Sequence, residues 1–162
     1  MSGSDTVTIE VTLNDRSLEE TVPARTLLSE FLRDHEHLTG THRGCETAKC
    51  GACTVLLDGD PVKSCNMLAA QVDGKELTTV EGLMDGDELH PVQEAFWNEH
   101  GMQCGFCTPG FVVSSAALLE EKEDPTIPEI QDHLAGNICR CTGYTKIIES
   151  VQEAADMQQE ER

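Results

Sequence analysis

Gly44-Cys45-Glu46-Thr47-Ala48-Lys49-Cys50-Gly51-Ala52-Cys53 places three cysteines within nine residues, and Cys65 follows after a gap of eleven. A second set of four comprises Cys104, Cys107, Cys139 and Cys141, so no cysteine of the eight is left over. The thiolate is the form of cysteine that binds metals, and thiolates that converge on one point repel one another. The two sets therefore predict two metal centres that offset this repulsion.

The spacing of the first set, C-x4-C-x2-C, is typical of the plant-type ferredoxin loop that holds a [2Fe–2S] cluster. The second set brings Cys139 and Cys141 to either side of a single residue, a geometry that suits two irons better than one zinc ion. Gly44 and Gly51 allow the backbone to approach the sulfurs closely and to donate N–H groups to them. We predict two [2Fe–2S] clusters, ligated by all eight cysteines, and a function in moving single electrons.

Two alternatives compete with iron–sulfur clusters. Structural zinc is one, but zinc motifs usually separate two tight cysteine pairs, whereas here three ligands crowd into nine residues. A disulfide framework is the other, and it requires an oxidising compartment. The stretch 1–15 is polar, which predicts no secretory signal, and no apolar run approaches the roughly 18 residues of a membrane span. A soluble, cytoplasmic protein is expected, in which disulfides do not persist.

The charge of the chain restricts its partners. Thirty acidic residues stand against eleven basic ones, for a formal net charge of −19. Nucleic acid and anionic membranes require a basic surface, so neither is expected as a partner. The scattered acids resemble those of proteins from salt-loving organisms, and an ordinary solvated acidic surface is the alternative. With 38% hydrophobic and 4% aromatic residues, the cores are expected to be small, and the bound clusters are expected to stabilise them.

The fold class expected is α+β, with a sheet-containing domain over 1–82 and a helical domain over 83–162. Alternating apolar residues predict a first strand over 7–13 and a second over 18–22. Thr26 is expected to cap a helix, and Asp58-Gly59 to turn a hairpin between 54–57 and 62–65 that returns Cys65 beside Cys53. A last strand is expected over 77–80.

Helical periodicity replaces the strand pattern after residue 89. A first helix around 92–96 is expected to close at Gly101, and Thr108-Pro109 opens a second. Thr126 and Glu129 fit a capping box for a third helix that ends near Gly136, and a fourth covers 147–155. The cysteine pairs of the second set fall at the joints between these helices.

The remaining polar residues offer little catalytic chemistry. The six histidines are expected to be solvated or capping residues, His42 among them, and no nucleotide-binding glycine motif or nucleophilic triad is present. Gln103 and Arg140 stand beside ligands. From spacing alone, Gln103 is a backbone-bonding loop residue and Arg140 a charge that stabilises nearby thiolates.

Four stretches together carry a family resemblance. They are Gly40-Thr41-His42-Arg43-Gly44-Cys45, Cys50-Gly51-Ala52-Cys53-Thr54-Val55, Gln103-Cys104-Gly105-Phe106-Cys107-Thr108-Pro109-Gly110 and Cys139-Arg140-Cys141-Thr142-Gly143-Tyr144. From about Val7 to Ala155 the chain resembles the small iron–sulfur subunit of the molybdenum hydroxylases, the family of xanthine dehydrogenase, aldehyde oxidase and aerobic carbon monoxide dehydrogenase. A departure is Ala48, where relatives often have glycine or serine.

The resemblance implies an N-terminal β-grasp, plant-ferredoxin-like domain and a C-terminal four-helix domain. It implies a large subunit with molybdopterin, a medium subunit with FAD, and a dimer of heterotrimers. Electrons would pass from molybdenum through the pterin to the C-terminal cluster, then to the N-terminal cluster and to FAD. By the same resemblance, Gln103 hydrogen-bonds the pterin and Cys141 is the ligand closest to it.

Two other functions stay open from the sequence. One is a free-standing two-cluster ferredoxin, and the other is an interaction module stabilised by a cluster or zinc without redox function. In the subunit reading the chain is part of an enzyme whose substrate site lies on another chain. The sequence therefore does not choose among carbon monoxide, aldehydes, purines and other heteroaromatics.

Overall fold

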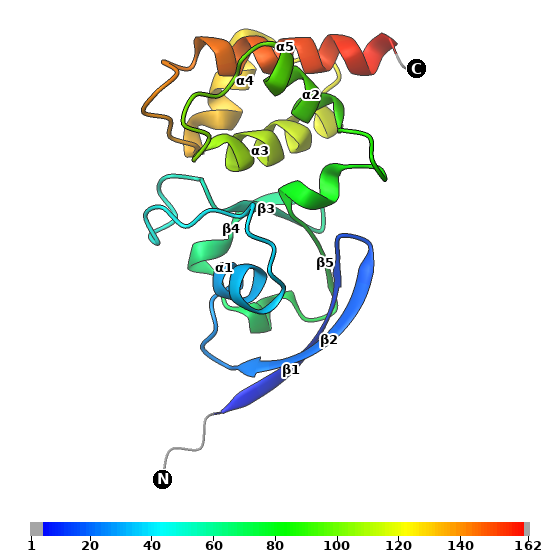
Figure 1. Ribbon diagram of the computed structural model, residues 1–162, viewed down its shortest axis with the longest axis vertical. Helices are drawn as coiled ribbons and strands as arrows, with labels where there is room; N and C mark the ends of the chain where they lie inside the picture. The colour runs from blue at the N-terminus through cyan, green and yellow to red at the C-terminus, as the bar shows by residue number, and fades with distance from the viewer. Residues whose placement is uncertain (1–4, 161–162) are drawn as a thin grey trace.

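The computed structural model describes residues 5–160, with a mixed sheet at one end and a group of helices at the other (Figure 1). The strands are β1 (Thr6–Leu13), β2 (Arg16–Pro23), β3 (Thr54–Leu57), β4 (Asp60–Lys63) and β5 (Lys75–Thr78). The α-helices are α1 (Leu28–Glu30), α2 (Pro91–Asn98), α3 (Thr108–Glu121), α4 (Ile127–His133) and α5 (Thr145–Glu160). This order confirms the predicted α+β class at the level of a mixed sheet followed by helices.

The sheet has the strand order β2-β1-β5-β3-β4. β1 pairs antiparallel with β2 and parallel with β5, and β3 pairs antiparallel with both β4 and β5. The predicted alternation along β1 is confirmed, because Ile9, Val11 and Leu13 are buried while Thr8 and Glu10 are exposed. One face of the sheet therefore carries the core of this half.

The helix that covers the sheet begins later than expected. Thr26 was expected at the N-cap, but the N-cap is Leu27, and α1 continues directly as a π-helical turn over Phe31–His35. The reason is a short strand-like pairing: the Thr26 carbonyl accepts from the Ala69 N–H at 2.8 Å, and the Leu28 N–H donates to the Met67 carbonyl at 2.8 Å. These bonds hold Thr26 and Leu27 extended and fully bury Leu28 and Phe31 under the sheet.

The β3–β4 hairpin positions the fourth cysteine of the first set. Its turn residues, Asp58 (φ 51°) and Gly59 (φ 88°), lie in the left-handed region that a two-residue hairpin turn requires. The return strand is shorter than predicted, since β4 ends at Lys63 and Cys65 lies in a 3-10 turn over Ser64–Asn66. The Ser64 N–H and hydroxyl donate to the Cys53 carbonyl at 3.2 and 2.7 Å, which brings Cys65 back beside Cys53 as predicted.

In the helical half, α3 is the central element. Its residues from Gly110 to Leu119 are buried, and it packs on β3 and β4 on one side and on α2, α4 and α5 on the other (Figure 1). The capping box between Thr126 and Glu129 at the start of α4 is confirmed. Within residues 5–160, no helix is long and apolar enough to span a bilayer.

Candidate metal centres

The first cysteine loop is wound so that its amide groups face sulfur. Glu46 (φ 54°), Ala48 (φ 58°) and Gly51 (φ 75°) lie in the left-handed region. The N–H groups of Thr47, Lys49 and Cys50 donate to Cys45 Sγ at 3.4, 3.3 and 3.3 Å. The Ala48 N–H donates to Cys65 Sγ at 3.4 Å. This hydrogen bond offsets part of the backbone strain of a non-glycine residue in the left-handed region.

The thiols of the first set differ in their affinity for protons. Hydrogen bonds from the Thr47 side chain and then from the Thr47 backbone lower the pKa of Cys45 to about 5. Burial raises the pKa of Cys65 to about 11, and the neighbouring Cys53 thiol acts in the same direction. Charges on crowded sulfurs oppose one another, so full ionisation of the set requires a bound cation to stabilise it.

The second set is built on the same chemistry. Cys139 Sγ accepts from the N–H groups of Cys141 and Thr142 at 3.4 Å each, and from the Thr142 hydroxyl at 3.2 Å. Burial acts to raise the pKa of Cys139, but the Thr142 bonds lower it below its usual value. Burial, followed by contact with the Cys139 thiol, raises the pKa of Cys107 to about 12. Contact with the Cys104 thiol raises the pKa of Cys141. The second set therefore contains two contacting pairs, Cys104 with Cys141 and Cys107 with Cys139.

The two sets differ in their exposure. In the first, Cys53 and Cys65 are buried, whereas in the second Cys104 and Cys141 are exposed. Gln103, which precedes Cys104, is also exposed. Phe106 (49% exposed), Ile138 (53%) and Tyr144 (39%) flank this second set. The second set therefore opens to the surface beside apolar side chains.

The residues present fit [2Fe–2S] clusters. Each set offers four cysteines, which is the ligand complement of such a cluster, and each has backbone N–H groups on its sulfurs. N–H bonds to sulfur stabilise the negative charge of an iron–sulfur core.

A backbone contact joins the two centres. The Ile138 N–H, next to Cys139, donates to the Cys50 carbonyl at 2.9 Å. Gly110 of α3 packs so closely on the first loop that a Cβ there would lie 2.1 Å from the Gly51 carbonyl oxygen. The two cysteine loops are therefore in direct contact, with no side chain between them at this point.

His42 is partly exposed and makes two contacts that the sequence does not predict. Its Nδ1 donates to the Phe106 carbonyl at 2.8 Å, and its ring stacks on Phe106 with centroids 4.9 Å apart. Phe106 lies between Cys104 and Cys107, so His42 bridges the first half of the chain to the second cysteine loop. No sequence signal pointed to this bridge, because its members are 64 residues apart.

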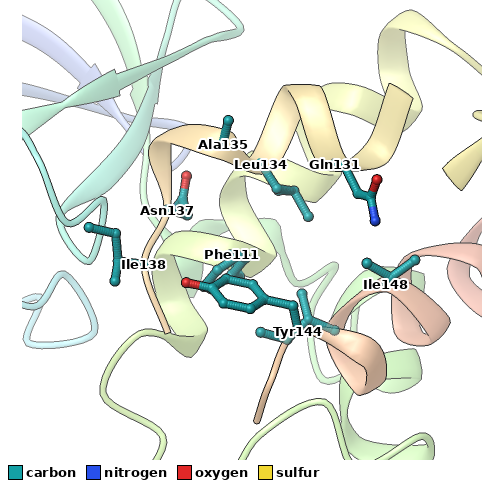
Figure 2. A pocket seen from close by; sticks show the side chains of 9 residues that line it. Phe111, Gln131, Leu134, Ala135, Asn137, Ile138, Tyr144 and Ile148 are labelled. Atoms are coloured by element: carbon teal, nitrogen blue, oxygen red, sulfur yellow. The ribbon is translucent and has the colours of Figure 1, made fainter. Parts of the chain in front are cut away.

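An apolar cavity of about 360 Å³ lies beside Ile138 and Tyr144, which flank Cys139 and Cys141 in the sequence (Figure 2). It is lined by Phe111, Gln131, Leu134, Ala135, Asn137, Ile138, Tyr144, Ile147 and Ile148. The Tyr144 ring meets Phe111 edge to face at 6.2 Å, and the Tyr144 hydroxyl accepts from the Cys139 N–H at 3.0 Å. Tyr144 therefore ties the cysteine loop to the wall of the cavity.

The family comparisons match both halves of the chain. Residues 11–83 match the 2Fe-2S iron-sulfur cluster binding domain, and residues 79–152 match the [2Fe-2S] binding domain. The nicotine 6-hydroxylase small subunit of Paenarthrobacter nicotinovorans is 51% identical over 153 residues, which cover 94% of this chain and 92% of the relative. The xanthine dehydrogenase iron-sulfur-binding subunit of Escherichia coli O157:H7 is 46% identical over 93% of this chain and 96% of its own length.

A solved structure agrees with these relatives. The crystal structure of quinoline 2-oxidoreductase from Pseudomonas putida 86 contains a chain with a TM-score of 0.91 and 39% identity, covering 96% of this chain and 97% of that one. Both the sequence and the fold are thus shared over nearly the whole length. The chain belongs to the small iron–sulfur subunits of the molybdenum hydroxylase family, the group of xanthine dehydrogenase and aldehyde oxidoreductase.

Proposed function

We propose that the chain is an electron-transfer subunit in which the eight cysteines hold two [2Fe–2S] clusters. Cys45, Cys50, Cys53 and Cys65 would hold the N-terminal cluster, and Cys104, Cys107, Cys139 and Cys141 the C-terminal one. Each cluster, when bound, takes up and passes on one electron at a time. The observation that carries the proposal is that both complete thiol sets receive backbone N–H bonds on sulfur and are joined by the Ile138–Cys50 hydrogen bond.

Exposure and the family support a proposed direction of transfer. The exposed side of the second set, with Gln103 and Cys141, would face a molybdopterin centre on a large subunit. The chain would receive electrons there, pass them across the Ile138–Cys50 contact to the first set, and deliver them to FAD on a medium subunit. In this arrangement the substrate is oxidised on the large subunit. Carbon monoxide, aldehydes, purines and other heteroaromatics are all compatible with this chain.

The assembly proposed is a dimer of heterotrimers in the cytoplasm. Within the chain, we place the boundary between a β-grasp domain (1–82) and a four-helix domain (83–162) at the linker before α2. Two separate cores support this division: one centres on Phe31 and Leu77, the other on Phe96 and Phe111.

Metal analysis tests the proposed function. The purified chain is expected to carry about four irons and four labile sulfides, since each of two sets holds a two-iron core. Its visible absorption is expected to bleach when dithionite is added. One or two zinc atoms per chain without sulfide would contradict the proposal and favour a zinc-stabilised interaction module.

Co-purification separates the subunit from a free-standing ferredoxin. A subunit is expected to elute with two larger chains, one with molybdenum and one with flavin. A chain that elutes alone from its native source, with both clusters bound and redox-active, would favour a free-standing ferredoxin.

Gln103→Ala is expected to leave both clusters assembled but to slow electron arrival from the molybdenum centre or to weaken cofactor retention. Gln103 is exposed in the chain alone, so its loss leaves the fold unchanged. In the complex, removing one partner of a buried hydrogen bond costs about 1–3 kcal/mol. The rate or the retention should therefore fall by roughly one to two orders of magnitude.

The control for this variant is Gln152→Ala, which truncates an exposed glutamine on α5 away from the cysteines. It is expected to behave as the wild type. If the Gln103→Ala complex turned over at the wild-type rate with full molybdenum occupancy, Gln103 would have no role toward the pterin and would be only a loop residue.

A further inference from the structure

Asn137 has a side chain whose hydrogen-bonding capacity is fully used inside the protein. It is only 4% exposed. Its Nδ2 donates to the Gly51 carbonyl at 3.1 Å and to Thr54 Oγ1 at 3.5 Å. Its Oδ1 accepts from Lys63 Nζ at 3.2 Å and from the Ser114 hydroxyl at 3.1 Å. A primary amide has two N–H donors and two oxygen lone pairs, and all four are engaged here.

These partners connect distant parts of the chain. Gly51 lies between Cys50 and Cys53, Lys63 ends β4, and Ser114 lies in α3. Asn137 itself precedes Cys139 by two residues. One buried side chain thus bonds the loop of the first cysteine set, the sheet and α3 from within the loop of the second set.

The backbone around Asn137 leaves no space for adjustment. A Cβ on Gly51 would lie 2.5 Å from the Gly136 carbonyl oxygen and 2.7 Å from Asn137 Cγ. The contact between the two loops is therefore close-packed. The position of one loop relative to the other depends on the side chain of Asn137. The Asn137 amide bonds to the first cysteine loop through Nδ2, and to β4 and α3 through Oδ1.

We propose that Asn137 is a positioning residue that fixes the separation and orientation of the two cysteine sets, and hence the coupling between the two clusters. The proposal rests on the proposed function, because it concerns clusters held by these cysteines. Spin coupling and electron tunnelling both fall steeply with distance, so a small displacement of one loop is measurable. The role is distinct from folding, since each half has its own apolar core.

Asn137→Asp is the sharpest variant because it keeps the shape of the side chain. The carboxylate still accepts from Lys63 and Ser114 but has no hydrogen to donate to the Gly51 carbonyl. Two oxygens then face each other, and their repulsion pushes the loops apart. Asn137→Ala removes all four hydrogen bonds of the Asn137 side chain and serves as the second variant.

The experiment is electron paramagnetic resonance of the dithionite-reduced complex with its partner subunits. We expect two cluster signals in the wild type with a spin–spin splitting between them. Asn137→Asp is expected to keep both signals and lose the splitting, and Asn137→Ala to lose it as well. Ser114→Ala is expected to reduce the splitting, because one of the four bonds is lost.

Ser115→Ala is the matched control for Ser114→Ala. Ser115 is the next residue of α3 and is equally buried, but its hydroxyl makes no hydrogen bond to any residue of 5–160. It is expected to keep the wild-type splitting.

Three results would overturn the inference. They are wild-type splitting in both Asn137 variants, loss of a cluster from Asn137→Asp, and two uncoupled signals in the wild type. All three leave the proposed function standing. Absence of two cluster signals from the wild type would instead refute the proposed function, and the inference with it.

Discussion

Cys139→Ala is expected to abolish the C-terminal cluster while the N-terminal cluster remains. Cys139 Sγ accepts three hydrogen bonds from Cys141 and Thr142, so its loss removes both a ligand and the group that organises its loop. The first set has its own N–H donors on Cys45 and Cys65 and keeps them. Iron content should fall to about two per chain. Electron paramagnetic resonance of the reduced variant should show one rhombic signal instead of two.

Two further variants complete this experiment. Cys141→Ala is expected to reproduce the result, and Cys45→Ala to give the complementary loss of the N-terminal signal. Loss of both signals in Cys139→Ala would show that the clusters assemble as one unit. The proposed boundary at 82/83 would then be wrong, and the Ile138–Cys50 contact would be the physical cause of the dependence.

Much of the fold follows from local sequence patterns. The alternation along β1 has a period that matches a half-buried strand, so Ile9, Val11 and Leu13 could be assigned to the core in advance. The Thr126–Glu129 capping box is likewise a contact over three residues, and it forms as expected. The cysteine spacing predicted both candidate centres, because three cysteines of the first set share one loop and the second set consists of two close pairs.

Contacts between distant residues could not be predicted in this way. Asn137 bonds Gly51 across 86 positions, and His42 bonds Phe106 across 64. A single asparagine or histidine in a sequence does not indicate which distant residue it will bond. Thr26 shows the same effect in a local element, because pairing with Ala69 overrides its tendency to cap the helix. Local sequence preference predicts where helices and strands lie. Contacts between distant residues decide where each element begins and what an isolated polar side chain bonds.

Gly110→Ala tests the contact between α3 and the first cysteine loop, and it is expected to be strongly destabilising. The added Cβ would lie 2.1 Å from the Gly51 carbonyl oxygen, 3.0 Å from the Gly51 carbonyl carbon and 3.1 Å from Ala52 Cα. All three are backbone atoms, so none can rotate away. Alanine gains about 1 kcal/mol over glycine in a helix. Overpacking costs about 1–3 kcal/mol, and the upper value of about 3 kcal/mol applies to a site that cannot relax.

The net loss for Gly110→Ala is about 2 kcal/mol, which lowers Tm by about 4–8 °C in a chain of this size. Thermal unfolding measures it, and Gly136→Ala is the matched control in the same interface. There the nearest atoms to an added Cβ are Lys63 Nζ at 3.6 Å and Cε at 3.7 Å, which are ordinary contacts with a flexible side chain. Gly136→Ala should therefore keep the wild-type Tm. If Gly110→Ala also kept it, with both clusters bound, α3 would have space against Gly51, and the close packing of α3 on the first cysteine loop would be refuted.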